Sequence, residues 1–266
     1  LDHFAVTNTS DGAIGTQVTG TSFDIRVRAQ DANNNTVTAF TGVGNAVTIS
    51  STGTLSAGSG TTATFTSGLL SSHAVTISNT GSFTITATKT AGTQPGTSAS
   101  FTVGAGAASA AQSTATVPAG TAGSVTTITV QAKDAQGNNR TATSGVVAAS
   151  ITGSNTASGS VTDNSNGTYT ITYTPTVAGT DAIAITLGGT AIGGSPYSSV
   201  VGAGTLDHFL VDAQGGGAIA GQTAGTAFAI RIVAQDANNN TVPSFSGVGN
   251  TVSLTSTGTM TGAPIT

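Results

Sequence analysis

Two short polar runs contain the residue types that could bind a cation. The runs consist of Asp31, Asn33 and Asn35 and of Asp236, Asn238 and Asn240, with looser clusters at Asp134 and Asn138 and at Asp163, Asn164 and Asn166. Oxygen-bearing side chains at alternate positions are typical of loops that bind Ca²⁺, a hard cation. Each run has only one carboxylate, however, and asparagine also stabilises turns without a metal. The pattern therefore predicts either a calcium site or a metal-free turn.

A catalytic centre is not expected. The sequence has no cysteine and no glutamate, and its ten acidic residues are all aspartate. A nucleophile–base pair would need a serine or threonine beside His3, His73 or His208. His3 and His208 each follow an aspartate, and such neighbouring pairs usually form structural hydrogen bonds. We predict that the protein is not an enzyme and has no catalytic or cofactor-binding residues.

These motifs belong to an internal repeat. Residues 1–61 return as residues 206–266 without a gap, and about 34 of the 61 aligned positions are identical. Repeats of fixed period are typical of arrays of stacked modules. We predict modules at 1–104, 105–204 and 205–266, the last a partial second copy of the first. Since the chain begins at a module boundary and stops inside a module, we expect it to be part of a longer repetitive polypeptide.

Alternating side chains predict β-strands that position these motifs. Phe23, Ile25, Val27 and Ala29 alternate with polar residues, so one face of the strand is buried and the other is wet. Clusters of Gly, Asn and Ser separate such segments by about 8–12 residues, as in a β-sandwich. The other expected strands are 46–51, 62–66, 73–78, 82–88 and 99–103 in the first module, and 124–132, 146–152, 168–173 and 182–187 in the middle one.

The nine phenylalanines all lie in the outer modules and the three tyrosines in the middle one, so we expect two distinct cores. The middle module has the longer motifs Asp163-Asn-Ser-Asn-Gly-Thr-Tyr-Thr-Ile-Thr-Tyr-Thr-Pro175, Ala178-Gly179-Thr180 and Gly194-Ser195-Pro196-Tyr197. The outer modules have Leu-Asp-His-Phe and Phe-x-Ile-x-Val-x-Ala-Gln-Asp-Ala-Asn, with Ile232 in place of the valine in the third module. The middle module resembles a filamin-type immunoglobulin repeat, and the outer modules resemble bacterial immunoglobulin-like repeats of the invasin and adhesin kind. The resemblance implies an all-β chain of tandem immunoglobulin-like β-sandwiches, two complete and one partial.

The composition excludes several classes of partner. A net charge of −4, with only 6% charged residues, provides no basic stripe for a nucleic-acid backbone. No apolar run reaches the length of about 18 residues that a membrane-spanning helix needs, so we expect neither nucleic-acid binding nor membrane insertion. The lack of cysteine excludes disulfides and thiolate metal sites, and it agrees with a large exported bacterial surface protein.

The links between modules predict joints with limited bending. Gly104-Ala105-Gly106 and Gly202-Ala203-Gly204 are short and apolar, unlike the long polar tethers of freely swinging domains. The third module holds only about half of the repeat, which leaves an apolar face and a strand edge uncovered. Three explanations remain open: the rest of the module lies further along the chain, a strand of a neighbouring chain completes it, or it exists as a free half-domain.

These features predict a non-enzymatic structural segment of a large repetitive extracellular or cell-surface protein. It would act as a stalk, a fibre, or a building block of a filament or surface layer, with other copies of the chain or further modules of a longer chain as partners. The alternative is an adhesin segment that binds surface glycans or proteins through its loops in a calcium-dependent way. The host, the full length, the assembly and the ligand stay open at this point.

Overall fold

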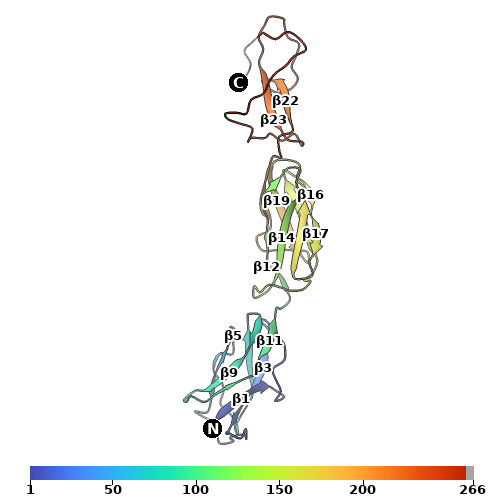
Figure 1. The fold of residues 1–266 in the computed structure, drawn as a ribbon. Helices are drawn as coiled ribbons and strands as arrows, with labels where there is room; N and C mark the ends of the chain where they lie inside the picture. Colours follow the sequence, from blue (N-terminus) through green and yellow to red (C-terminus); the bar gives the residue numbers. More distant parts are fainter. Residues whose placement is uncertain (262–266) are drawn as a thin grey trace.

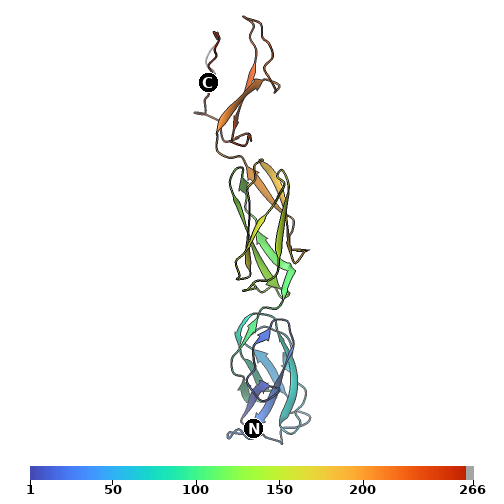
Figure 2. The same cartoon turned by 90° about the vertical axis from the view of Figure 1, so that its right-hand side faces the viewer.

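Residues 1–261 are described by a computed structural model, and they contain strands and turns but no helix. The all-β prediction is therefore confirmed. Sandwiches follow one another along a line, with the N terminus at one end and strands β22 and β23 near the other (Figures 1 and 2). We call residues 1–104, 105–204 and 205–266 the first, middle and third modules; residues 262–266 of the last lie outside the described residues. Residues 1–261 therefore contain no helix that is long and apolar enough to cross a membrane.

The first module is built from three small sheets. Its strands are β1 (His3–Asn8), β2 (Gln17–Val18), β3 (Phe23–Gln30), β4 (Val47–Ser51), β5 (Leu55–Ala57), β6 (Gly60–Thr61), β7 (Leu69–Ile77), β8 (Gly81–Phe83), β9 (Ile85–Lys89), β10 (Pro95–Thr97) and β11 (Phe101–Gly104). They pair in the orders β1-β3-β7-β5, β10-β9-β4-β6 and β2-β11-β8. The alternation in β3 follows the prediction, because its odd-numbered apolar residues Ile25, Val27 and Ala29 are fully buried.

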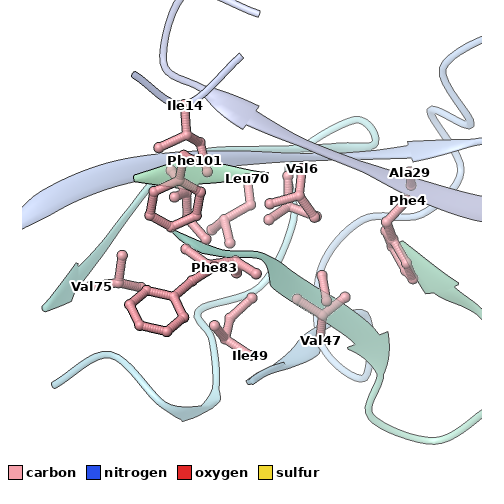
Figure 3. Packing of buried hydrophobic residues seen from close by; sticks show 14 of the residues in the cluster. Phe4, Val6, Ile14, Ala29, Val47, Ile49, Leu70, Val75, Phe83 and Phe101 are labelled. Atoms are coloured by element: carbon pink, nitrogen blue, oxygen red, sulfur yellow. The ribbon is translucent and has the colours of Figure 1, made fainter. Parts of the chain in front are cut away.

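Aromatic rings fill the core of the first module. Phe4, Phe40 and Phe65 form a triplet with ring centroids 4.8–5.8 Å apart, in tilted and edge-to-face arrangements. Phe83 and Phe101 pack with aliphatic residues elsewhere in the same cluster (Figure 3). Aromatic pairs of this geometry add to the free energy gained from burial.

The middle module has a separate core with a different composition. Its strands are β12 (Ala108–Thr116), β13 (Gly120–Thr121), β14 (Thr126–Asp134), β15 (Val147–Gly153), β16 (Ala157–Ser158), β17 (Ser160–Asp163), β18 (Thr168–Tyr173), β19 (Gly179–Leu187), β20 (Thr190–Ala191) and β21 (Tyr197–Gly202). The sheets have the orders β12-β14-β18-β17 and β13-β21-β19-β15-β16, with β20 on β19. Tyr169 and Tyr173 are buried among isoleucines and valines, as the division of aromatic residues predicts.

Two strand predictions for the first module are wrong. Residues 62–66 form no strand: the Thr62 hydroxyl donates to the carbonyl of Ala63, and the run crosses from the edge of one sheet toward another while burying Phe65. Residues 82–88 divide at Thr84, because β8 pairs with β11 whereas β9 pairs with β4 and β10. A strand that changes sheets in this way keeps its alternation, so the sequence pattern cannot show the break.

The third module contains one antiparallel pair among its described residues. Strands β22 (His208–Ala213) and β23 (Ile230–Gln235) repeat the pairing of β1 with β3. Ile219 is 40% exposed, whereas its repeat counterpart Ile14 is 6% exposed. Phe209 and Phe245 line a cavity of about 530 Å³ on this face. The described part of the third module therefore leaves apolar surface open.

Candidate functional site

Three turns of the same design follow strands β3, β14 and β23. In each turn an aspartate Oδ1 accepts the backbone N–H groups of the residues two and four positions later. The residue four positions later is an asparagine, whose Nδ2 donates to the carboxylate. The pairs are Asp31 with Asn35, Asp134 with Asn138, and Asp236 with Asn240. The residue before each asparagine has a left-handed backbone, with φ of 64°, 83° and 66°. Asparagine and glycine adopt this conformation at low cost, which explains their presence there.

The second of these turns closes the joint between the first and middle modules. Thr19 of the first module donates its hydroxyl to Asp134 Oδ2 over 2.5 Å, and the linker residue Gly106 donates its N–H to the same oxygen over 3.0 Å. Asn138 Nδ2 donates to the carbonyl of Ser78 over 2.8 Å. Asp134 is fully buried. One turn of the middle module thus binds the linker and the end of the preceding module together.

The third turn closes the joint between the middle and third modules in the same way. Gly204 donates its N–H to Asp236 Oδ2 over 2.6 Å. Asn240 Nδ2 donates to the carbonyl of Thr176 over 2.9 Å, and Asn240 Oδ1 accepts the N–H of Ala178 over 2.7 Å. Asp236 is 1% exposed. The predicted residues of the second polar run are therefore brought together at a contact between modules.

A glycine in each preceding module makes room for the docked turn. A Cβ on Gly20 would lie 2.2 Å from Gln136 Nε2, and one on Gly123 would lie 3.0 Å from Asn238 Nδ2. Both glycines have positive φ, of 70° and 78°. The third residue of each turn thus packs directly over a glycine of the neighbouring module, which places Asn238 in the contact.

The two joints differ at one hydroxyl. Ala122 occupies the place of Thr19, since the N–H of each bonds to the carbonyl of the last strand residue, Gly202 or Gly104, over 2.9 Å. Ala122 and Asp236 line a cavity of about 250 Å³ at the second joint. The second joint therefore has space beside the carboxylate where the first joint has a hydrogen-bond donor.

Ala122→Thr is expected to strengthen the second joint by about 1 kcal/mol, the usual net value of a hydrogen bond. Exchange of the Gly204 amide hydrogen should then slow about fivefold. Thr19→Val should speed exchange at Gly106 by a similar factor. Ala122→Val is the matched control, because it fills the cavity without supplying a donor; slowing by valine equal to that by threonine would show that volume and not the hydroxyl matters.

A buried network inside the middle module supports the loop onto which Asn240 docks. Asp181, which is fully buried, accepts the backbone N–H of Asn155 at Oδ1 over 2.8 Å and the hydroxyl of Tyr173 at Oδ2 over 3.1 Å. Asn155 Oδ1 in turn accepts the N–H groups of Thr176 and Val177 over 2.8 and 2.9 Å. Burial, together with the nearby Asp181 carboxylate, raises the pKa of Tyr173, so the phenol stays a donor. Hydrogen bonds thus run continuously from the core to the joint.

The joint carboxylates stay ionised in spite of their position. Burial opposes ionisation of Asp134 and Asp236, but the hydrogen bonds that each accepts outweigh it. The pKa of each carboxyl is held at about 2, compared with an ordinary value of 3.8. Hydrogen bonds to an ionised acceptor are stronger than those between neutral groups.

Acid is expected to open both joints. The pKa values of Asp134 and Asp236 are lowered from 3.8 to about 2 in the folded chain, by hydrogen bonds within each turn and by those across each joint. Their contribution to stability is therefore complete above about pH 4 and is lost as the pH falls through about 2. Small-angle scattering should show a rod at pH 5 that becomes flexible toward pH 2. The variant with Asp134→Asn and Asp236→Asn controls for the other carboxyl groups, and an equal acid response in that variant would contradict the assignment.

The donor set of the turns favours a metal-free structure. Asp31 Oδ1 already accepts the N–H groups of Asn33 and Asn35 over 2.9 Å, and the amide nitrogen of Asn35, rather than its oxygen, faces the carboxylate. Within residues 1–261 there is no group of three or more His, Cys, Asp or Glu side chains that could hold a metal ion. The calcium site at Asp31, Asn33 and Asn35, and at Asp236, Asn238 and Asn240, stays a prediction.

Thermal unfolding in calcium and in EDTA tests this prediction. Calcium at a hundred times the dissociation constant of a site would add about 2.7 kcal/mol of stability. We expect the two melting curves to coincide, because a cation would have to displace N–H donors from the carboxylate. A clear rise of the melting temperature in calcium, absent in Asp31→Asn, would establish the site.

The remaining sequence candidates lie apart from the joints. His3 and His208 each contact the preceding aspartate through Nδ1 at 3.0 Å on the surface, and no described serine or threonine hydroxyl bonds to either ring. Asp163 caps the loop between β17 and β18 by accepting the N–H of Ser165, and Asn166 accepts that of Thr168. These are local hydrogen bonds at exposed positions.

Sequence reasoning missed Thr19, Asn155 and Asp181 as functional residues. A signal for part of the site was present in the sequence, because Asp134 and Asn138 share the four-residue spacing of the other two turns. Thr19 and Asp181 have no such signal, because their role depends on residues 115 and 26 positions away.

Comparisons with known proteins agree with this architecture. Residues 105–198 match the family model of the Filamin/ABP280 repeat, which confirms the resemblance of the middle module. The Escherichia coli adhesin FdeC is similar in structure, with 24% identity and a TM-score of 0.50, over 91% of this chain and 76% of its own. This likeness and the family match confirm the predicted fold class of tandem immunoglobulin-like β-sandwiches.

Two further structures share weaker similarity. Invasin, a bacterial integrin-binding protein, is 21% identical with a TM-score of 0.43, over 92% of this chain and 48% of its own. Domains 4–9 of the surface-layer protein SbsC are 21% identical with a TM-score of 0.30, over 80% of this chain and 33% of their own. No curated protein sequence matches the chain.

Proposed function

We propose that this chain is a non-enzymatic structural segment of a large extracellular or cell-surface protein. It holds immunoglobulin-like sandwiches end to end, as a stalk, a fibre, or a building block of a filament or surface layer. The observation that carries the proposal is the pair of joints, in which a buried aspartate turn bonds to both the linker and the preceding module. Such contacts resist bending, which a spacer requires and a flexible tether lacks.

Two more observations support this function. The modules extend in one line and not into a compact cluster (Figures 1 and 2). The fold is shared with FdeC, an adhesin, and this supports a location at the cell surface. We also propose residues 1–104, 105–204 and 205–266 as the modules, because the joint carboxylates bind the linker N–H groups of Gly106 and Gly204, within two residues of these boundaries.

The partners we propose are further modules of a longer chain or other copies of the same chain. The return of residues 1–61 at 206–266 supports this choice, because repeats of fixed period are typical of arrays of stacked modules. Nucleic acid and membrane lipid are not proposed as partners, since the net charge of the chain is −4 and only 6% of its residues are charged.

Small-angle scattering and electron microscopy test the proposal. We expect particles whose modules keep one line, with the same shape in calcium and in EDTA. The variant with Asp134→Asn and Asp236→Asn should instead give bent, variable particles, because each substitution places an amide N–H against the linker N–H. Freely jointed particles in the unaltered protein would contradict the proposal.

The alternative is an adhesin segment that binds glycan or protein through its loops. A glycan screen with the intact chain separates the two functions. The spacer proposal expects no saturable binding, and clear saturable binding would replace it with the adhesin function.

A further inference from the structure

We propose that the exposed turn at Gln30–Asn35 is a docking surface for the end of a filamin-type module, through the same contacts that join the middle and third modules. The inference rests on the proposed function and adds a third joint to it. The turn would accept the N–H of a linker residue, such as Gly204. It would also bind a loop that offers one carbonyl and one N–H, such as those of Thr176 and Ala178.

The docked and exposed turns are the same structure. Residues 30–37 and 235–242 are identical in sequence. The N–H of Asp31 bonds to the carbonyl of Asn35 over 3.0 Å, as Asp236 does to Asn240, and Asn34 and Asn239 have φ of 64° and 66°. The turn at Asp31 therefore already has its docked shape, so little ordering would be needed on binding.

The exposed turn lacks only the contacts between modules. Asp236 Oδ2 accepts a linker N–H, whereas Asp31 Oδ2 accepts only Asn35 Nδ2 among the described residues. Asn240 Oδ1 accepts the N–H of Ala178, whereas Asn35 Oδ1 accepts none from residues 1–261. By the repeat offset of 205, Thr176, Ala178 and Gly204 have no counterparts in the sequence.

The chemistry of the turn selects the type of module. At the first joint the turn docks on the end of the first module. Arg140 follows this turn, and its guanidinium donates to the carbonyls of Ala105 and Gly106 in the linker. Val37 and Val242 occupy this place in the outer modules, since all three residues donate their N–H to the equivalent strand carbonyl over 2.9 Å. The Asp31 turn therefore matches the turn that docks on the middle module, and we assign a filamin-type end as its partner.

The test adds residues 105–205 ahead of Leu1 in the full chain, which repeats the native order Gly204-Thr205-Leu206-Asp207 as Gly204-Thr205-Leu1-Asp2. The chain has no cysteine, so pairs of introduced cysteines can carry spin labels. Val125, Val43 and Val248 are exposed, and Val43 is the repeat counterpart of Val248. Labels at Val125→Cys of the added module and Val43→Cys report the new joint, and labels at Val125→Cys and Val248→Cys in the native chain report the existing one.

The expected result is one narrow distance distribution that is the same for both joints. Asp31→Asn should abolish the narrow peak at the new joint, because it keeps the Oδ1 acceptor that shapes the turn but places N–H donors against the linker. Asp236→Asn is the matched control at the native joint. If the distance distribution were narrow at the native joint but broad at the new joint, and Asp31→Asn did not change the latter, the inference would be overturned while the proposed function would stand. A broad native distribution would overturn the proposed function and the inference together.

Discussion

Asp181→Ala is expected to lower the free energy of unfolding of the middle module by about 3 kcal/mol. The substitution leaves the Asn155 N–H and the Tyr173 hydroxyl without their acceptor in a fully buried place, and each unsatisfied buried donor costs about 1–3 kcal/mol. Denaturant unfolding followed by tyrosine fluorescence measures the loss, because all three tyrosines belong to this module.

The same substitution should also loosen the second joint. Asn155 holds Thr176 and Val177, and the loop they form presents the carbonyl and N–H groups that Asn240 binds. Amide exchange at Gly204 should therefore be faster in Asp181→Ala, at a denaturant-free condition where the module stays folded. Asp163→Ala is the matched control, because Asp163 caps an exposed loop. Equal destabilisation by both substitutions would contradict the network.

Asp134→Ala is expected to weaken the first joint by about 2 kcal/mol, which corresponds to exchange at Gly106 about thirtyfold faster. The carboxylate accepts donors from Thr19, Gly106 and Asn138, so its removal frees the linker and the preceding module together. Scattering should show a bend between the first and middle modules while the second joint stays rigid.

Asp31→Ala is the control for the loss of the turn itself. It removes the same Oδ1 contacts with the backbone but no contact between described modules. If Asp31→Ala and Asp134→Ala changed the stiffness of the first joint alike, the joint role of Asp134 would be refuted. A change confined to Asp134→Ala supports it.

The sequence predicted most strands because alternation is a local property. Phe23 to Ala29 and 168–173 are strands whose buried and exposed faces follow residue order alone. The division at Thr84 and the irregular run at 62–66 were not predictable, since they depend on which sheet each residue joins. The asparagine turns were identified as polar clusters. The sequence did not distinguish a metal-free turn from a calcium site, because both use the same residue types.

The sequence by itself determined the modular β architecture, the two kinds of core and the places of the aspartate–asparagine turns. These follow from repeat, periodicity and turn chemistry, which act over a few residues. Only the tertiary structure decided what the turns do: identical residues 30–37 and 235–242 are exposed in one module and docked in the other. The physical reason is that such a carboxylate can hold two modules together only where the preceding module and its linker bring hydrogen-bond donors to Oδ2 and exclude water from that oxygen.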